Sequence, residues 1–256
     1  MRVTIVQLAM ADRPKKINLE HALRMVDKAP QSDLILLPEA WPCGFFSFDR
    51  YQEDSETLDG LVVNAFKNMA RKRNCHIFMG SMIESDGGHL YNTSIFLNPK
   101  GNVAARYRKI HLFGYQSKEA EILTPGQNVV VTDSPWGING LSTCYDLRFP
   151  ELFRRMVDRG AMFFLVASAW PHIRLDAWRL FNQCRAHENL AFLISCNCAG
   201  ANQNTQYAGH SMVVDPLGQV VAEGGEDEQL VTAQIDPELV DAVRRDFPAL
   251  RDRVFS

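Results

Sequence analysis

The chain has 256 residues, of which 46% are hydrophobic and 22% are charged, and its formal net charge at pH 7 is −3. This length and composition suit a large apolar core, and we expect one domain over residues 1–256. The weak negative charge gives no support for binding to nucleic acid or to a membrane surface, and no apolar run approaches the length of a membrane span.

The first residues and the cysteines indicate a cytoplasmic protein. Met1–Leu8 reads as a strand and lacks the longer apolar region and the small-residue cleavage site of a signal peptide. The six cysteines are scattered without the spacing of a disulfide framework, as expected in a reducing cytosol.

Strands and helices are predicted to alternate along the chain. Apolar runs and apolar–polar alternation predict strands at 3–8, 33–39, 76–83, 90–97, 103–107, 129–131, 138–141, 162–167, 190–197, 207–214, 219–222 and 230–235. Apolar residues at helical spacing predict helices at 16–28, 58–73, 150–160, 176–188 and 237–245. The segments 41–48, 114–126, 168–175 and 200–205 read as loops.

Two kinds of strand are recognisable in this pattern. The strands between 76 and 107 are joined by the short turns 86–88 and 99–102, which is typical of an antiparallel meander. Segment 33–39 instead has four consecutive apolar residues, which is typical of a strand buried on both faces. Two mixed sheets packed face to face, with helices outside, accommodate both kinds.

In the helix predicted at 176–188, Asp176 is a candidate N-terminal cap. Trp178, Leu180, Phe181 and Cys184 are expected on its inner face.

Three candidate catalytic residues follow predicted strands. Cys144 lies between a buried strand and a helix that begins at Pro150, where α/β proteins carry reactive side chains and where a thiol can ionise more easily. Glu39 and Lys109 also stand at strand ends. Each alone could be structural, because cysteine often packs as a small hydrophobe and charged side chains are mostly exposed. Together they would supply a base, a nucleophile and an oxyanion donor.

Three motifs resemble those of the nitrilase, or carbon–nitrogen hydrolase, superfamily. They run in the family's order over nearly the whole chain and comprise Leu37–Glu39, Tyr107–Phe113 and Cys144–Glu151, with supporting matches at Arg185–Asn189, Gly209–Ser211 and Asp215–Gly218. The resemblance implies an α/β fold built as a four-layer αββα sandwich. It also implies an acyl-enzyme mechanism without a metal or other cofactor, and a homodimer or higher homo-oligomer.

The same resemblance assigns expected roles to individual residues. Glu39 matches the family's general base, Lys109 its oxyanion-stabilising lysine and Cys144 its nucleophile. The backbone N–H of Tyr145 is the expected second oxyanion donor. Glu119 best matches the family's second glutamate.

Alternatives exist for several of these positions. The distance of Glu119 before the segment 124–126 favours it over Glu121. A Cys–His protease would use His111, but it would leave the matched glutamate and lysine without a function. His210 reads as a structural hydrogen-bonding residue, and no His-Glu-x-x-His or paired Cys-x-x-Cys motif supports a metal site.

The motifs are most similar to the ω-amidase-type branch. That branch implies hydrolysis of a small, carboxylate-bearing amide, such as a 2-oxo acid ω-amide or deaminated glutathione, to the carboxylic acid and ammonia through a cysteine thioester. Arg174 is the first candidate for binding the substrate carboxylate. Arg148 is the second, since it could instead form a structural ion pair. Trp170 and Phe45 are candidate pocket walls.

Other substrates and classes stay open. Trp41–Gly44 and Trp170–His172 depart from the commoner family pattern at positions expected to select substrates, so a nitrile, a neutral aliphatic amide or an N-carbamoyl substrate is an alternative. Tyr145 stands where true nitrilases usually have tryptophan, which argues against nitrile hydrolysis. A non-catalytic binding protein on the same scaffold is the competing class.

Overall fold

The computed structural model describes residues 1–254 and contains two six-stranded mixed sheets. The first sheet has the order β15 (Gln229–Gln234), β1 (Arg2–Gln7), β3 (Leu34–Leu36), β4 (His76–Asp86), β5 (His89–Leu97) and β6 (Val103–Arg108). The second has the order β14 (Val220–Glu223), β13 (Met212–Val214), β10 (Phe192–Asn197), β9 (Phe163–Ser168), β8 (Gly137–Thr143) and β7 (Val131–Ser134).

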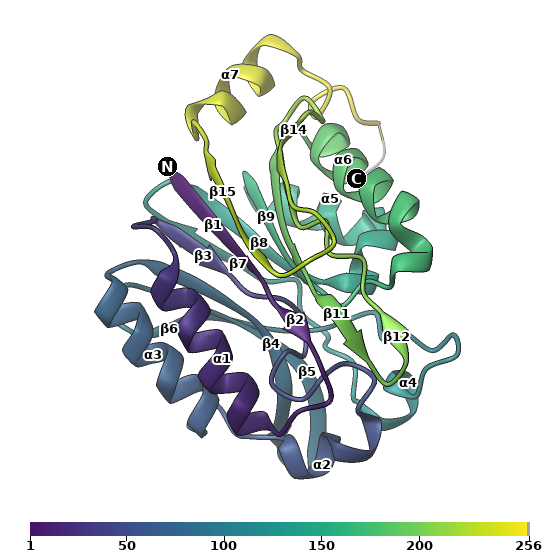
Figure 1. The fold of residues 1–256 in the computed structure, drawn as a ribbon. Helices are drawn as coiled ribbons and strands as arrows, with labels where there is room; N and C mark the ends of the chain where they lie inside the picture. Colours follow the sequence, from purple (N-terminus) through teal and green to yellow (C-terminus); the bar gives the residue numbers. More distant parts are fainter. Residues whose placement is uncertain (255–256) are drawn as a thin grey trace.

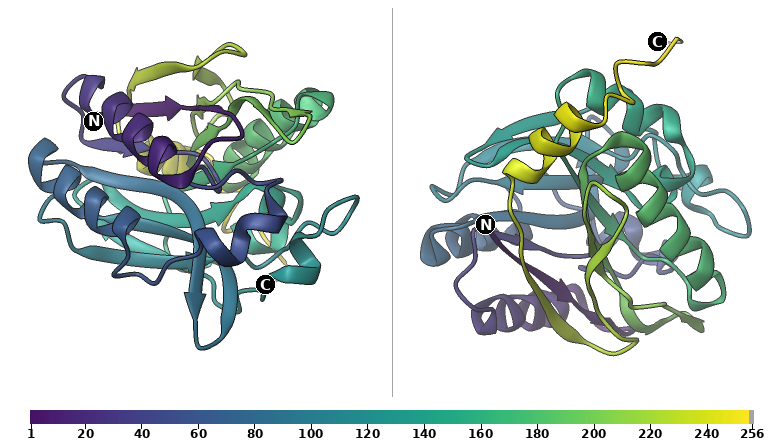
Figure 2. Two further views of the ribbon diagram at one scale, coloured as in Figure 1. Left: turned by 60° about the horizontal axis from the view of Figure 1, so that its bottom comes forward. Right: turned by 90° about the horizontal axis from the view of Figure 1, so that it is seen from above.

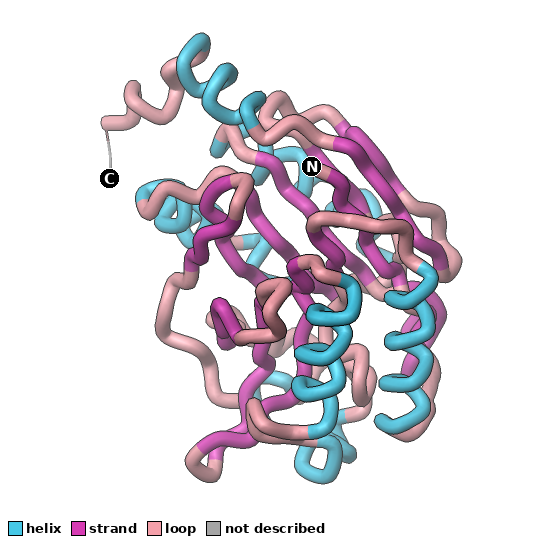
Figure 3. The backbone as a smooth tube through the Cα atoms, turned by 90° about the vertical axis from the view of Figure 1, so that its left-hand side faces the viewer, coloured by secondary structure: helices cyan, strands magenta, loops and turns pink. Residues whose placement is uncertain are grey.

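Helices cover the outer faces of both sheets, which gives the predicted αββα sandwich (Figure 1). Helices α1 (Lys15–Lys28) and α3 (Leu61–Arg73) lie side by side on the first sheet (Figure 3). Helices α5 (Pro150–Asp158) and α6 (Leu175–Asn189) cover the second. Helix α7 (Glu238–Asp246), yellow in Figure 2, lies at one end of the sandwich.

The strand β3 shows why the first sheet is buried on both faces. Leu34 and Leu36 point into the core between the two sheets, whereas Ile35 points into a second core under α1 and α3. All three side chains are inaccessible to solvent. Their period-two alternation between two apolar layers explains the uninterrupted hydrophobic run in the sequence.

The predicted antiparallel meander is confirmed. Strands β4 and β5 pair antiparallel, as do β5 and β6, while β1, β3 and β4 pair in parallel. In residues 1–254, no helix has both the length and the apolar character that crossing a membrane requires.

The inner face predicted for the helix at 176–188 is partly wrong. Trp178 is buried, but Leu180 is 65% exposed and Cys184 is also exposed. The buried stripe instead includes Asn182 and Arg185, which hydrogen-bond to backbone carbonyls. Because polar residues occupy inner positions, the apolar pattern alone misplaces the stripe. The prediction of Asp176 as the cap is also wrong, since the helix starts one residue earlier.

Two segments near 200–214 also differ from prediction. The predicted loop at 200–205 contains parts of β11 (Ala199–Asn202) and β12 (Thr205–Gln206), which form a small sheet with β2 (Ala9–Met10). Positive φ angles at Gln203 and Asn204 make the tight turn between β11 and β12. The strand predicted at 207–214 is limited to β13, because Gly209 and His210 have positive φ angles that interrupt the extended backbone.

Short helical segments also occur outside the five predicted helices. They are α2 (Tyr51–Asp54), α4 (Glu119–Ile122) and the 3-10 turns Phe48–Arg50, Cys144–Arg148 and His172–Arg174.

Candidate active site

Glu39 reaches the interior because the chain leaves β3 beside a bulge in β4. The pairing of β4 with β5 shifts between Phe78 and Ser81, and Gly80 between them has φ +65°. A Cβ atom on Gly80 would lie 1.9 Å from the carbonyl oxygen of Pro38. Only glycine therefore allows this close approach. The Glu39 N–H then donates to Ser168 O in the second sheet at 3.3 Å.

Lys109 follows β6 and is held by backbone contacts on both sides. Its N–H donates to Asn92 O at 2.9 Å, and its carbonyl accepts the N–H of Gly126 at 2.8 Å. A Cβ on Gly126 would lie 2.0 Å from Arg108 O, so the segment after α4 also needs a glycine at this point. The lysine side chain is fully buried.

Cys144 stands at a sharp turn after β8, as predicted. Its φ is +48°, which is uncommon for a residue with a side chain and is often found at functional sites. The turn is stabilised by a capping box between Thr143 and Asp146. Asp146 also accepts the hydroxyl of Tyr107 at 2.6 Å and contacts Nδ1 of His111 at 2.7 Å. The cysteine turn is therefore tied to the segment that carries Lys109.

Glu39, Lys109 and Glu119 form a buried ion cluster. Lys109 Nζ lies 2.8 Å from Oε1 of Glu39, and 3.0 and 2.9 Å from Oε1 and Oε2 of Glu119. All three side chains are at most 1% exposed. Glu119 lies in α4, within a segment predicted as a loop, whereas the alternative Glu121 is exposed.

Backbone and side-chain N–H groups donate the other hydrogen bonds to the two carboxylates. The N–H of Ala169 donates to Oε2 of Glu39 at 2.9 Å, and the N–H of Phe113 donates to Oε2 of Glu119 at 2.7 Å. Asn92, which lies outside the motifs recognised in the sequence, donates to both carboxylates. Asparagine is depleted in strands, so its place in the strand predicted at 90–97 is the signal that could have identified it.

The electrostatics keep the Cys144 thiol protonated in the resting site. Burial and the Glu39 carboxylate raise the pKa of Cys144 well above its usual value, although Lys109, Ser168 and the Ala169 N–H oppose this. The expectation of an easily ionised thiol is therefore wrong. Burial alone would lower the pKa of Lys109, but the two carboxylates raise it above its usual value. Lys109 is thus a permanent cation beside the thiol.

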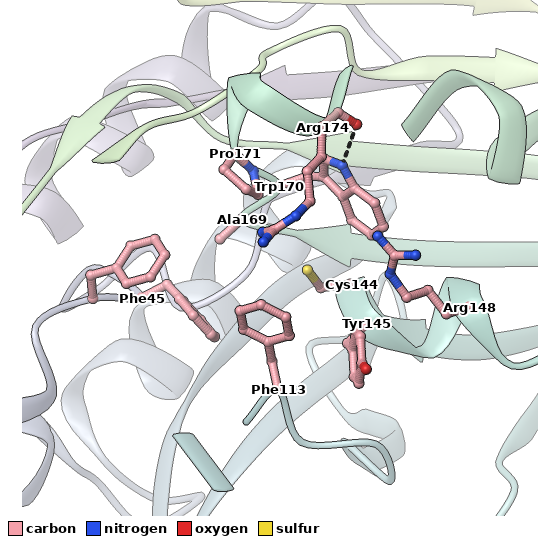
Figure 4. Close-up of a pocket in the computed structure, with 10 residues that line it drawn as sticks. Phe45, Phe113, Cys144, Tyr145, Arg148, Ala169, Trp170, Pro171 and Arg174 are labelled. Carbon is pink, nitrogen blue, oxygen red and sulfur yellow. Dashed lines mark hydrogen bonds between the residues drawn. The ribbon is translucent and has the colours of Figure 1, made fainter. Parts of the chain in front are cut away.

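A pocket opens above the sulfur of Cys144 (Figure 4). Its walls are mostly aromatic, and the residues that line it are Phe45, Phe46, Phe113, Cys144, Tyr145, Arg148, Ala169, Trp170, Pro171 and Arg174. All four predicted substrate-binding residues, Phe45, Arg148, Trp170 and Arg174, are among them. Phe113 was not predicted as a wall, although it belongs to the motif that carries Lys109.

Each of the two pocket arginines lies over an aromatic ring. The guanidinium of Arg174 lies 5.5 Å from the ring centre of Phe113, and that of Arg148 lies 5.3 Å from the ring centre of Trp170. Within residues 1–254 neither arginine forms an ion pair with a carboxylate. Arg148 thus lacks the structural ion pair considered as its alternative role.

Several positions expected near the substrate lie elsewhere. Trp41 is buried on Phe66 and donates to Met79 O at 2.8 Å, so it belongs to the core. Cys43 is also buried and does not line the pocket. His172 turns away towards Glu226. Of the two departures noted in the sequence, only Trp170 and Pro171 therefore contribute to the pocket.

The two histidines considered have structural partners. His111 contacts Asp146 and stacks on Phe149 with ring centres 3.7 Å apart. Nδ1 of His210 lies 2.8 Å from Glu223.

Among the described residues, no three His, Cys, Asp or Glu side chains gather in a way that could hold a metal ion. The arrangement offers a thiol, a carboxylate acceptor for its proton and a fixed cation, a combination suited to acyl transfer.

Comparison with known proteins agrees with this chemistry. The model of the carbon–nitrogen hydrolase family matches residues 2–245. The 2-oxoglutaramate amidase of Paenarthrobacter nicotinovorans is 33% identical over 237 residues, which cover 90% of this chain and 81% of that enzyme. The omega-amidase NIT3 of Saccharomyces cerevisiae is 33% identical and is matched over 100% of this chain and 94% of its own length.

Solved structures show the same fold. The crystal structure of yeast Nit3, described as a member of branch 10 of the nitrilase superfamily, has a TM-score of 0.90 and 32% identity, covering 100% of this chain and 97% of that one. XC1258 of Xanthomonas campestris, a CN-hydrolase superfamily protein with an arsenic adduct in its active site, has a TM-score of 0.94 and 30% identity, with coverage of 100% and 98%. The chain belongs to the carbon–nitrogen hydrolase family and is an amidase.

Proposed function

We propose that this amidase hydrolyses the amide of a small carboxylate-bearing substrate, with 2-oxo acid ω-amides such as 2-oxoglutaramate first and deaminated glutathione second. The observation that carries this proposal is a narrow aromatic pocket in which Cys144 lies near two arginines. Their guanidinium groups have no carboxylate partner within the described residues, so they can bind an anionic substrate. The names of the two similar amidases support the same substrate class.

We propose the following first half-reaction. Glu39 accepts the proton of Cys144 as the sulfur attacks the amide carbonyl carbon. Lys109 and the backbone N–H of Tyr145 stabilise the oxyanion. Glu39 then returns the proton to the leaving nitrogen, the C–N bond breaks, and an acyl thioester remains on Cys144.

The second half-reaction uses the same groups. Glu39 takes a proton from water, and the resulting hydroxide attacks the thioester carbonyl. The C–S bond breaks, the carboxylic acid leaves, and Glu39 returns the proton to the sulfur of Cys144, which restores the thiol. Glu119 accepts hydrogen bonds from Lys109 with both carboxylate oxygens. Its proposed role is to keep the ammonium aimed at the carbonyl oxygen.

The finer cellular and assembly assignments are also proposals. We propose that the chain acts as a single hydrolase domain in the cytoplasm and as a homodimer or larger homo-oligomer. The resemblance of the motifs to the carbon–nitrogen hydrolase superfamily supports this assembly. Light scattering of the purified protein tests this, and a monomer at micromolar concentration would contradict it.

The substrate proposal is tested with a panel of small amides. Release of carboxylic acid and of ammonia or amine is measured with 2-oxoglutaramate, deaminated glutathione, glutamine, a neutral aliphatic amide and an N-carbamoyl amino acid. We expect the highest kcat/KM for one of the first two. Preference for the neutral amide or the N-carbamoyl compound would overturn the substrate class and leave the amidase assignment intact.

A further inference from the structure

The side chain of Asn92 bridges the two glutamates of the ion cluster. Asn92 lies in β5 and is 1% exposed. Its Nδ2 donates to Oε1 of Glu39 at 2.8 Å and to Oε1 of Glu119 at 2.9 Å. Its backbone carbonyl accepts the N–H of Lys109 at 2.9 Å. One residue therefore contacts all three members of the cluster.

The orientation of the Asn92 amide follows from these contacts. Only its NH₂ group can donate to two carboxylates. The opposite atom, Oδ1, is buried and has no hydrogen-bond partner within residues 1–254. A buried acceptor without a donor is unfavourable, so the hydrogen bonds to the two carboxylates must outweigh this cost.

The bridge leaves one oxygen of Glu39 available to the thiol. Oε1 accepts from both Asn92 and Lys109, whereas Oε2 accepts the backbone N–H of Ala169. With one donor instead of two, Oε2 keeps a lone pair that can accept the proton of Cys144.

We infer that Asn92 is a positioning residue of the reaction. Its amide fixes the rotation of the Glu39 carboxylate, so that Oε2 carries the proton between Cys144 and the leaving nitrogen. Asn92 itself gains and loses no proton. The inference rests on the proposed role of Glu39 as base, and it does not depend on the identity of the natural substrate.

Charge balance predicts how the cluster responds when this donor is lost. The titratable groups that act on Glu39 from the elements packed around it are Lys109, Glu119, Cys144, Tyr51, Cys198 and Tyr207. Of these, only Lys109 is a cation. Without the Asn92 amide, the two carboxylates share one cation and each has one fewer hydrogen bond, so a proton is retained by the pair up to a higher pH.

The test uses p-nitrophenyl acetate, an activated ester that can acylate Cys144 whatever the natural amide is. Acylation is followed by p-nitrophenol release and by the acetyl mass on the Cys144 peptide, from pH 5 to 9. We expect Asn92→Ala to slow acylation by about 10²-fold, the typical cost of misplacing a reacting group by about 1 Å. We also expect the acidic limb of its pH profile to move to higher pH, with little change in KM.

Asn139→Ala is the matched control. Asn139 is a buried amide in β8 that bonds Trp136 and backbone carbonyls away from the cluster. Its loss should lower the melting temperature and leave the shape of the pH profile unchanged. A purely structural role for Asn92 would make the two variants behave alike.

Two further variants keep the test conclusive if Asn92→Ala does not fold. Asn92→Asp keeps the shape but adds a third acidic group, and we expect it to be slower than Asn92→Ala. Asn92→Ser restores one short donor, and we expect it to be faster than Asn92→Ala. An Asn92→Ala or Asn92→Asp variant within about twofold of the parent, or one with an unmoved acidic limb, would overturn the inference. A parent enzyme that is acylated but cleaves none of the amides in the panel would overturn only the substrate proposal.

Discussion

Lys109 Nζ lies 2.8 Å from Oε1 of Glu39, although the two residues are 70 positions apart and neither side chain is accessible to solvent. Burying a charge is costly unless it is paired and hydrogen-bonded, and here each charge has several partners. Asn92 in β5 and Glu119 in α4 supply further contacts to this pair. This cluster presents a fixed cation and a carboxylate to the thiol of Cys144.

Replacing Lys109 by methionine should reduce both activity and stability. The change leaves Glu39 and Glu119 buried without a cation, at a cost of about 3–5 kcal/mol. Burial and Glu39 already raise the pKa of Glu119, while Lys109 lowers it. Removal of the lysine therefore raises the pKa of Glu119 further. The folded variant then binds a proton that the unfolded chain releases, and its stability falls as pH rises.

Urea unfolding of Lys109→Met and of the parent enzyme at pH 5.5 and pH 8 checks this. The loss of stability should be larger at pH 8. Lys15→Met, which removes a partly exposed ion pair with Glu56, serves as the control and should change stability by about 1 kcal/mol or less. An equal loss of stability for Lys109→Met at both pH values would contradict this electrostatic role of Lys109.

Glu39→Gln should separate thiol reactivity from amide turnover. Loss of the base should lower kcat by about 10²- to 10⁴-fold. The Glu39 carboxylate raises the pKa of Cys144, so its neutralisation lowers that pKa and increases the thiolate fraction at a given pH. Iodoacetamide should therefore still alkylate Cys144, and more readily than in the parent enzyme.

The alkylated peptides are quantified by mass spectrometry, with exposed Cys184 as the internal reference. Glu121→Gln, at the exposed alternative position, should leave both turnover and alkylation unchanged. Retention of turnover by Glu39→Gln would show that another group acts as the base.

Arg174→Ala should raise KM for an anionic amide and leave KM for a neutral amide nearly unchanged. A hydrogen bond to a charged group contributes about 1.5–3 kcal/mol, which corresponds to an increase of about 10- to 10²-fold. The change is measured with 2-oxoglutaramate and with a neutral aliphatic amide. Arg148→Ala is made in parallel, and we expect a smaller effect from it. Equal changes for the anionic and neutral amides would remove Arg174 from carboxylate recognition.

Cys144→Ala should abolish turnover and leave the fold intact. The side chain is small, and the turn around it is stabilised by Asp146 and Thr143 and not by the thiol. Far-ultraviolet circular dichroism and the melting temperature should resemble those of the parent enzyme, while kcat falls below detection. A folded variant with substantial turnover would exclude a covalent mechanism.

Local sequence patterns were sufficient to predict most strands and helices of the αββα sandwich. The buried run at 34–36, the meander from β4 to β6 and the strand–turn–helix at Cys144 each depend on short-range periodicity and turn residues. The stripe of α6 was misplaced because Asn182 and Arg185 are buried through hydrogen bonds, which a count of apolar residues does not detect.

The site itself depends on contacts between distant segments. Motif resemblance indicated Glu39, Lys109, Glu119 and Cys144, but the bridging role of Asn92 follows from the pairing of β5 with its neighbours. The sequence also did not predict that the Cys144 thiol is protonated, because burial and the nearby Glu39 carboxylate determine this. Such effects appear only when the two sheets are packed together.

The most direct test of the central claim is rapid-quench mass spectrometry of the enzyme during turnover of 2-oxoglutaramate. We predict that the peptide containing Cys144 gains the mass of the acyl group, that is, of the substrate minus ammonia. We also predict that the adduct decays at the rate of product formation and is absent from Cys144→Ala. Product formation with no adduct on Cys144, together with turnover by Cys144→Ala, would contradict a thioester at this residue.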